Sequence, residues 1–294
     1  MSKRRMKPYF LSLIVFLLFL SDVQAQSYKQ RDQFVGRVKA IRLELVYLDT
    51  EAARAAQERH LSALRTFDTS GRLTSYEDFY AYGAISYGRD TYSYDSAGNV
   101  IEKAHEINGS VYKTTYSYDT KGRMITQSGG GHLREYRYDA DGRLTEVKRS
   151  YNDGTDDGKE LMSYDPGGLL TGRKTYDRNG SLEAQETKAY NAEGHLVREV
   201  APFGTKSYDA TGRLLSEITG KHSSDRYYRK VVYKYDGNGR VAGEDIYDGK
   251  GLKETFVYTY EYDSVGNWTK QVTVNTVIEG RTRVWETYRI ITYY

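Results

Sequence analysis

The residues that could do chemistry are spread thinly along the chain. The five histidines are His60, His105, His132, His195 and His222, and no two of them are closer than 27 residues. No HExxH or comparable spacing of metal ligands occurs. His195 follows a turn glycine at a position where similar segments carry Arg or Asn, which indicates a surface residue beside a turn. The histidines therefore predict neither a metal site nor a catalytic base.

One acidic stretch resembles the start of a calcium-binding loop. The segment NDGTDDGKE places Asp153, Thr155 and Asp157 at alternate positions, with Gly158 next. Such a loop closes with a bidentate glutamate, but Tyr164 occupies the closing position. We therefore expect the tip of an acidic hairpin here and no bound calcium.

Carboxylates could also serve a glycosidase, which needs a pair of them across the scissile bond. Glu102, Glu146 and Glu217 are the candidates, and their mutual distances cannot be read from the sequence. No nucleophile–base set accompanies them. The sequence therefore predicts no catalytic residue and no cofactor.

Most of the remaining aspartates belong to a repeated segment. Its pattern is an aromatic residue, Asp or Asn, two free residues, Gly, one free residue and an apolar residue. The pattern occurs ten times, starting at Phe67, Tyr94, Tyr118, Tyr138, Tyr164, Tyr176, Tyr190, Tyr208, Tyr235 and Tyr262. The starts are 12 to 27 residues apart, so the length of the unit varies while its central turn is constant. An eleventh segment, at Tyr247, has Lys253 in place of the apolar residue.

The constant part predicts a three-residue hairpin loop. Asp accepts hydrogen bonds from backbone N–H groups two residues on, and Gly adopts the left-handed conformation that closes a type I turn with a bulge. In the segment YRYDADGRL this loop places Tyr138 opposite Leu144 and Asp139 opposite Arg143, with the ion pair near solvent on the other face. The structural turn residues predicted in this way are Asp95, Gly98, Asp119, Gly122, Asp139, Gly142, Asp209, Gly212, Asp236, Gly239, Asp263 and Gly266.

A second tyrosine often stands two residues before the turn tyrosine, on the same face of the strand. These outer tyrosines are candidate binding residues for a sugar ring or a partner side chain: Tyr92, Tyr116, Tyr136, Tyr233 and Tyr260. A tyrosine beside a carboxylate can stack and donate a hydrogen bond, and Glu102 and Glu146 are expected opposite Tyr92 and Tyr136. The alternative is that the rings pack on one another as part of the sheet.

The run of YDxxGRL segments resembles the RHS or YD-repeat family over Phe67 to about Lys270. The resemblance implies successive hairpins wound into a curled sheet. In long members this sheet forms a hollow shell around a toxin, and teneurins carry a related shell. Those long proteins end in a core segment with a self-cleaving Asp-Pro motif. The single Asp-Pro here, Asp165-Pro166, lies inside an ordinary repeat, so we expect neither a toxin cage nor a toxin domain after the repeats.

The first 25 residues have the three parts of a secretory signal peptide. A basic start is followed by an apolar run from Phe10 to Leu20 and by Val23-Gln24-Ala25, a small-x-Ala cleavage pattern. The run of 11 residues is short for a membrane-spanning helix, which needs about 20. We expect cleavage after Ala25, no stable membrane span in the mature chain, and a secreted or periplasmic location.

The charge of the chain restricts the class of partner, and its cysteine content restricts how the fold is stabilised. Residues 1–25 contain four of the 43 basic and one of the 40 acidic residues, which leaves 39 of each in the mature chain. A near-neutral chain gives no electrostatic reason to expect nucleic acid as a partner. The absence of cysteine means that the fold is stable without disulfides.

The 30 tyrosines favour an all-β fold, because tyrosine suits a pleated, half-buried surface. We predict a repeat protein of successive antiparallel hairpins that form a curled sheet or partial shell. The expected divisions are residues 1–25, the signal peptide; 26–66, an amino-terminal strand with a connecting loop or short helix; 67–270, the hairpin repeats; and 271–294, strands that cap the open edge.

Three functions remain open from the sequence. The favoured one is an exported, non-enzymatic binding or scaffold module whose partner is a carbohydrate or a cell-surface protein. The second is a polysaccharide-acting enzyme with its site in a groove of the sheet. The third is an accessory remnant of an RHS toxin-delivery system. An enzyme would break the repeat at its active site, whereas the breaks in this repeat read as loops, which favours the binding module.

Overall fold

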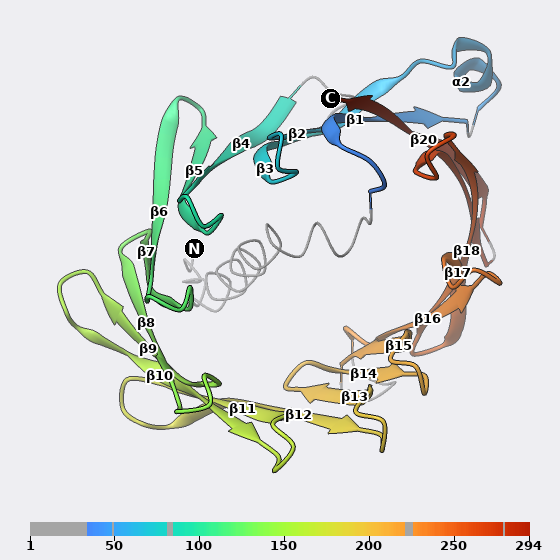
Figure 1. Ribbon diagram of the computed structural model, residues 1–294. Helices are drawn as coiled ribbons and strands as arrows, with labels where there is room; N and C mark the ends of the chain where they lie inside the picture. Colours follow the sequence, from blue (N-terminus) through green and yellow to red (C-terminus); the bar gives the residue numbers. More distant parts are fainter. Residues whose placement is uncertain (1–33, 49, 81–84, 221–225, 279) are drawn as a thin grey trace, which may run out of the picture.

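The computed structural model describes residues 34–48, 50–80, 85–220, 226–278 and 280–294. Most of them belong to strands of one antiparallel sheet, which confirms the predicted all-β repeat fold. Figure 1 shows the strands following one another around a ring, viewed along its axis. The predicted signal peptide lies outside the described residues.

The described residues form 20 strands and one short helix. The first half of the ring consists of β1 Val38–Tyr47, α2 Glu51–Ala56, β2 His60–Phe67, β3 Leu73–Tyr80, β4 Ile85–Tyr94, β5 Val100–Ile107, β6 Ser110–Tyr118, β7 Met124–Gly129, β8 His132–Tyr138, β9 Leu144–Tyr151 and β10 Asp156–Tyr164. The second half consists of β11 Leu170–Tyr176, β12 Leu182–Tyr190, β13 Leu196–Ala201, β14 Gly204–Tyr208, β15 Leu214–Thr219, β16 Arg229–Tyr235, β17 Val241–Asp248, β18 Gly251–Tyr262, β19 Trp268–Val277 and β20 Thr282–Tyr293.

The sheet is closed, which corrects the prediction of a curled sheet or partial shell. Each strand pairs with the next along the chain, and β20 also pairs with β1, from Val38 opposite Tyr293 to Tyr47 opposite Trp285. The two terminal strands of the described sheet therefore cover each other's edges, which would otherwise be open to pairing with other chains. β19 and β20, which occupy the segment expected to cap an open edge, are part of the continuous wall.

The repeat turns explain why the sheet curls far enough to close. In all ten repeat hairpins the strand register shifts by one residue directly before the turn aromatic. A bulge of this kind bends the strand and increases the local twist. Ten bulges distributed around the sheet accumulate enough curvature for 20 strands to meet. A ring of 20 strands is wider than one whose inward side chains fill its centre.

The repeat turns gather at one end of the ring. Because neighbouring strands are antiparallel, turns after even-numbered strands share one end, which we call the turn rim, and turns after odd-numbered strands share the other, the opposite rim. Nine repeat turns follow even-numbered strands, from the β2–β3 turn to the β18–β19 turn, and lie at the turn rim. The tenth, Asp177–Ser181, follows β11 and lies at the opposite rim.

Several of the most buried apolar side chains lie at the seam where β1 and β2 meet β19 and β20. Val38, Ile41 and Val46 are almost completely buried there. The Arg289 guanidinium lies over the ring of Trp268, 3.5 Å from its centroid. Because a single-layer sheet has no second layer to pack against, the seam supplies much of the buried apolar surface of the described residues.

The amino-terminal end of the described chain joins the last repeat turn to the first. The backbone N–H and carbonyl of Val35 bond to the side chain of Asn267, both at 2.8 Å. The Arg37 side chain donates to the carbonyl of Thr69 in the first turn. The Tyr294 hydroxyl donates to the carbonyl of Phe67, 2.6 Å away. The circle of turns is thus continuous across the seam.

Candidate functional site

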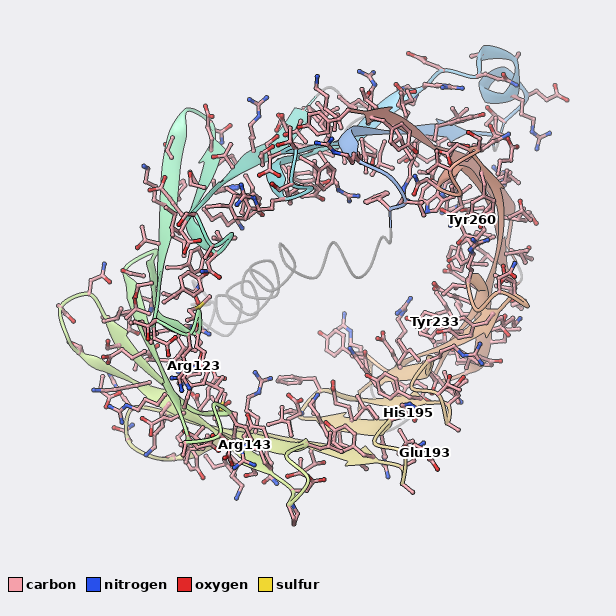
Figure 2. All side chains as sticks on the ribbon, in the orientation of Figure 1. Arg123, Arg143, Glu193, His195, Tyr233 and Tyr260 are labelled. Atoms are coloured by element: carbon pink, nitrogen blue, oxygen red, sulfur yellow. The ribbon has the colours of Figure 1, made fainter. Side chains whose placement is uncertain are left out.

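The candidate site is the inner face of the ring, which carries the tyrosines that precede each turn. Figure 2 shows Tyr233, Tyr260 and Arg123 on the side of the sheet that faces the middle of the ring. Residues at alternate positions on the same strands lie on this face as well, and so do the residues paired with them on neighbouring strands. The described side chains leave the centre of the ring unfilled in this view (Figure 2).

Each repeat turn is held by the same set of hydrogen bonds. In the β8–β9 turn, the N–H of Asp139 donates to the carbonyl of Arg143, and the N–H of Gly142 donates to the carbonyl of Asp139. Gly142 has a φ of 82°, the left-handed conformation that the bulge requires. The backbone N–H of Arg143, followed by its guanidinium, holds the pKa of Asp139 below its usual value. The turn carboxylate is thus committed to structure.

In six repeats the hydroxyl of the turn tyrosine ties its hairpin to a neighbouring one. Tyr138 donates to the carbonyl of Met124 at 2.8 Å, and Met124 is the apolar residue after the previous turn. The same bond joins Tyr94 to Leu73, Tyr118 to Val100, Tyr164 to Leu144, Tyr190 to Leu170 and Tyr235 to Leu214. These phenol groups therefore stabilise the contacts between hairpins, and their hydroxyls are engaged by backbone carbonyls.

The turn arginine extends this link, which corrects its predicted position near solvent on the other face. Nε of Arg143 bonds to the Asp139 carboxylate at 2.7 Å, and its guanidinium lies 5.4 Å from the ring centroid of Tyr164 in the next hairpin. The same stacking joins Arg72 to Tyr94, Arg123 to Tyr138, Arg213 to Tyr235 and Arg240 to Tyr262. Stacking covers the guanidinium face while the edge remains bonded to Asp, so both groups are satisfied on one side of the turn.

Replacing Tyr138 by phenylalanine tests the hydroxyl bond between hairpins. We expect the variant to lose about 1 kcal/mol of unfolding free energy, because the partly buried carbonyl of Met124 loses the hydrogen bond from this hydroxyl while the ring is retained. Urea denaturation followed by circular dichroism measures the difference. Tyr112→Phe is the matched control, since Tyr112 is 59% exposed. An unchanged midpoint in Tyr138→Phe together with a shifted one in Tyr112→Phe would contradict the assignment.

The five predicted binding tyrosines lie on the inner face, but most of their surface is occupied. Tyr116 is buried, and Tyr136 donates its hydroxyl hydrogen to Oε1 of Gln127, the residue paired with Tyr116. Tyr92 and Tyr233 are half-buried, and Tyr260 bonds to the carbonyl of Val241 and to the side chain of Gln271. The structure brings Tyr116 and Tyr136 together through Gln127.

The predicted partners of two of these tyrosines are wrong. Tyr92 lies opposite Lys103, and Tyr136 lies opposite Val147. Glu102 instead pairs with Ser93. The bulge next to each turn inserts one residue after the apolar position, which shifts the strand register by one and turns the glutamate to the outer face.

Between the tyrosines, a row of alternating charges crosses the inner face from β8 to β13. The bonded pairs are Arg134–Glu160 at 4.0 Å, Arg173–Glu160 at 3.5 Å, Arg173–Glu186 at 2.8 Å, Lys188–Glu186 at 2.8 Å and Lys188–Glu199. Burial alone would raise the pKa of Glu186, but Lys188 and Arg173 lower it overall. This part of the wall is therefore ionised and balanced in charge.

Burial also shifts the pKa values of tyrosine hydroxyls. Burial, followed by nearby carboxylates, raises the pKa of Tyr94, Tyr118 and Tyr233 to about 12. An unfolded chain has tyrosines with a pKa of about 10. The folded protein therefore holds these protons more tightly, and this contribution to stability is fully present below about pH 10 and lost as the pH rises through about 12.

We accordingly expect the ring to unfold between about pH 10 and pH 12 as its buried phenols ionise. Circular dichroism and phenolate absorbance recorded on the same samples measure the two events. Phenolate formation and unfolding should coincide for the buried class, while exposed tyrosines titrate earlier. Complete ionisation of all tyrosines near pH 10 with the fold intact would contradict the burial described here.

Two other residues considered for chemistry, Asp153 and His195, make hydrogen bonds within or between turns. Asp153 accepts a hydrogen bond from the N–H of Thr155 at the tip of the β9–β10 hairpin. Nδ1 of His195 lies 2.8 Å from the carbonyl of Ala210 in the β14–β15 turn, and Figure 2 shows His195 beside Glu193, which belongs to the same β12–β13 turn. Among the described residues, no cluster of three or more His, Cys, Asp or Glu side chains could hold a metal ion. No helix in the described part of the chain is both long and apolar enough to span a membrane.

Sequence reasoning missed a group of exposed tyrosines at the opposite rim. Tyr80, Tyr87 and Tyr112 are 42%, 57% and 59% exposed, more open than the predicted set. They stand outside the repeat pattern, and that departure is the signal that could have identified them, because the fold does not use them for its turns.

Comparison with known proteins identifies the repeat. A family model described as the teneurin YD-shell matches residues 14–265. No curated protein matches the chain. Among solved structures, a TcdB2–TccC3–Cdc42 complex is 13% identical with a TM-score of 0.37, and the Photorhabdus luminescens Tc holotoxin pore is 17% identical with a TM-score of 0.35. Each match covers 84% of this chain and 16% of the other, so the chain spans a small part of those proteins. A porin-like protein from Bacteroides uniformis is 12% identical with a TM-score of 0.38, over 88% of this chain and 98% of that protein.

Proposed function

The chain belongs to the teneurin YD-shell family, and on that premise we propose that it is a non-enzymatic shell module that binds a cell-surface glycan or protein. The observation that supports this most is the closed ring with a polar, tyrosine-lined inner face. A ring of this width presents a continuous concave surface, and such surfaces are where repeat proteins bind extended partners.

The commitment of the polar groups argues for binding over catalysis. The turn aspartates bond to their own turns, six turn tyrosines bond to neighbouring carbonyls, and the charges on the wall pair with one another. An active site needs groups that the fold does not use. In this proposal Tyr92, Tyr116, Tyr136, Tyr233 and Tyr260 form the rigid wall of the binding surface, and more exposed side chains make the main contacts.

A glycan array probed with residues 26–294 tests the proposal, followed by product analysis of each glycan that is bound. Binding without cleavage is the expected result. Release of shorter sugars would contradict the non-enzymatic role and favour the polysaccharide-acting alternative. If no glycan is bound, the glycan branch of the proposal is excluded and a protein partner is left.

We further propose that the chain is exported and acts outside the cytoplasm. The amino-terminal segment has the pattern of a signal peptide, with cleavage expected after Ala25. Mass spectrometry of secreted or periplasmic material should find Gln26 at the amino terminus. An intact Met1 in that material would contradict the proposed processing.

A further inference from the structure

A cluster of exposed aromatic rings lies at the opposite rim, on the inner face between β3 and β6. Tyr80 and Tyr87 stack with their ring centroids 4.3 Å apart. Tyr80 shares its face with Asp78 and Tyr76, two and four residues earlier on β3. Tyr112 stands on the same face, at the start of β6. The three exposed rings thus border one side of the mouth of the ring.

Hydrogen-bonding side chains fill the space between these rings. Tyr112 lies opposite His105, which lies opposite Asp90, and Asp90 lies opposite Tyr76. Asp90 bonds to Nδ1 of His105 at 2.7 Å and to Lys103 at 3.3 Å. One row across four strands therefore combines an aromatic face, an imidazole and a carboxylate.

The position of His105 depends on a glycine. Gly88 is the residue of β4 before which the β3–β4 register shifts, and it has a φ of 121°. A Cβ atom on Gly88 would lie 2.7 Å from Cε1 of His105 and 2.7 Å from the carbonyl oxygen of Glu106. The imidazole thus packs directly on the backbone of β4, at the residue that follows Tyr87.

The charges of this cluster are balanced. Asp78 accepts a hydrogen bond from Tyr76, and burial raises its pKa above the usual value while Tyr76 and Arg65 oppose the rise. Lys103 neutralises Asp90. An anionic polymer such as nucleic acid, or a strongly acidic peptide, finds no net positive field here.

We propose that this cluster, defined as Tyr80, Tyr87, Tyr112, Asp90 and His105, is a binding site for a neutral oligosaccharide. The inference rests on the proposed function and names the class of partner. Exposed tyrosine rings offer apolar faces for the C–H face of a sugar ring, and their hydroxyls offer hydrogen bonds. The carboxylate of Asp90 and the imidazole of His105 accept and donate hydrogen bonds to sugar hydroxyls between those faces.

The rings are spaced for more than one sugar unit. Tyr112 stands two strands away from Tyr87, about 10 Å across the sheet. It lies in the row of Asp90 and His105, and Asp90 follows Tyr87 by three residues on β4. Platforms at this separation suit an extended chain that lies across the strands at the mouth of the ring. A single sugar would contact one platform and gain little, so we expect affinity to rise with the length of the oligosaccharide.

Titration calorimetry on residues 26–294 tests the site, with cellohexaose, chitohexaose, xylohexaose and maltohexaose as probes. Tyr87→Ser and Tyr112→Ser should each weaken binding of the preferred hexaose by about tenfold, which corresponds to about 1.4 kcal/mol. Their melting temperatures should remain within a few degrees of the parent, because both side chains are more than half exposed. Tyr227→Ser is the matched control: Tyr227 is 72% exposed and lies before β16, on the other side of the ring.

The outcomes separate this inference from the proposed function. Loss of affinity in Tyr87→Ser and Tyr112→Ser, with Tyr227→Ser unchanged, supports the site. Unchanged affinity in both variants overturns the site while a glycan-binding function stands. Failure of every hexaose to bind the parent chain also overturns the site, and binding of a protein partner in the same assay format would then place the function elsewhere on the ring.

Discussion

Alanine at Gly158 should destabilise the ring by more than about 4 kcal/mol, whereas alanine at Gly142 should cost about 1–2 kcal/mol. Both glycines have positive φ, 99° and 82°. A Cβ atom on Gly158 would lie 2.1 Å from the carbonyl oxygen of Tyr176, a contact that backbone movement alone can relieve. At Gly142 the nearest atom is Nη1 of Arg123, 3.5 Å away. Backbone strain is therefore the only cost at Gly142, and a steric clash is added at Gly158.

Urea denaturation of the two alanine variants beside Asp141→Ser measures the difference. Asp141 is a free turn position with a largely exposed side chain, and its ion pair with Arg143 at 2.9 Å is of the surface type that contributes little. We expect Asp141→Ser to unfold near the parent midpoint, Gly142→Ala somewhat earlier and Gly158→Ala much earlier. Equal midpoints for the two glycine variants would show that β10 does not approach β11 as closely as described.

Removal of β20, residues 282–294, should make the chain aggregate. The deletion exposes the edges of β1 and β19, each about ten residues long and rich in β-branched residues. Exposed long edges recruit strands from other chains. It also removes Arg289 from Trp268 and the Tyr294 hydroxyl from Phe67. Size-exclusion chromatography with light scattering measures the oligomeric state.

Deletion of Tyr294 alone is the control for that truncation. It removes one hydroxyl bond and one backbone bond, from the N–H of Tyr294 to the carbonyl of Arg37, but leaves β20 paired with β1. We expect this variant to keep the oligomeric state of the parent chain, with a modest loss of stability. A monomeric and cooperatively unfolding 1–281 chain would be incompatible with a seam that closes the sheet.

The local structure of the repeats follows from short-range chemistry, which is why the sequence predicts it well. Asp139 and Gly142 specify the loop between them, because the carboxylate accepts backbone N–H groups and the glycine supplies positive φ. The pairing of Tyr138 with Leu144 follows directly from the loop length. All of these contacts lie within a few residues of one another along the chain.

Other features depend on contacts between distant parts of the chain or on a strand register that shifts by one residue. Closure joins Ile41 to Ile291, a contact that no local pattern encodes. The partner of Tyr92 was mispredicted because one bulge residue moves the strand register. The spacing of the repeat starts does contain a usable signal. The short steps from Tyr164 to Tyr176 and from Tyr176 to Tyr190 each span one strand and put the Tyr176 turn at the opposite rim, whereas the longer steps span two strands.

The candidate site also combines features that local sequence predicts with features that depend on the whole fold. The outer tyrosines were predicted from their alternation, which correctly groups them on one face but says nothing of the partners that occupy them, such as Gln127 for Tyr136. Exposure at Tyr87 and Tyr112 arises at strand ends beyond the repeat, where the neighbouring strands leave the rings uncovered. The exposure of these two rings depends on the arrangement of the strands in the closed ring as a whole.

The closed ring is tested most directly by a covalent bond across its seam. The chain has no cysteine, so Arg42→Cys with Ile290→Cys introduces the only pair, at positions that lie opposite each other on β1 and β20 and face solvent. Directly opposed residues fall within the Cα separation that a disulfide spans. Arg42→Cys with Val257→Cys, on the distant strand β18, is the control pair. Mild oxidation at low protein concentration, followed by mass spectrometry of the monomer fraction, should show a near-complete intramolecular disulfide in the seam pair and free thiols in the control. Free thiols or only intermolecular dimers in the seam pair would contradict closure.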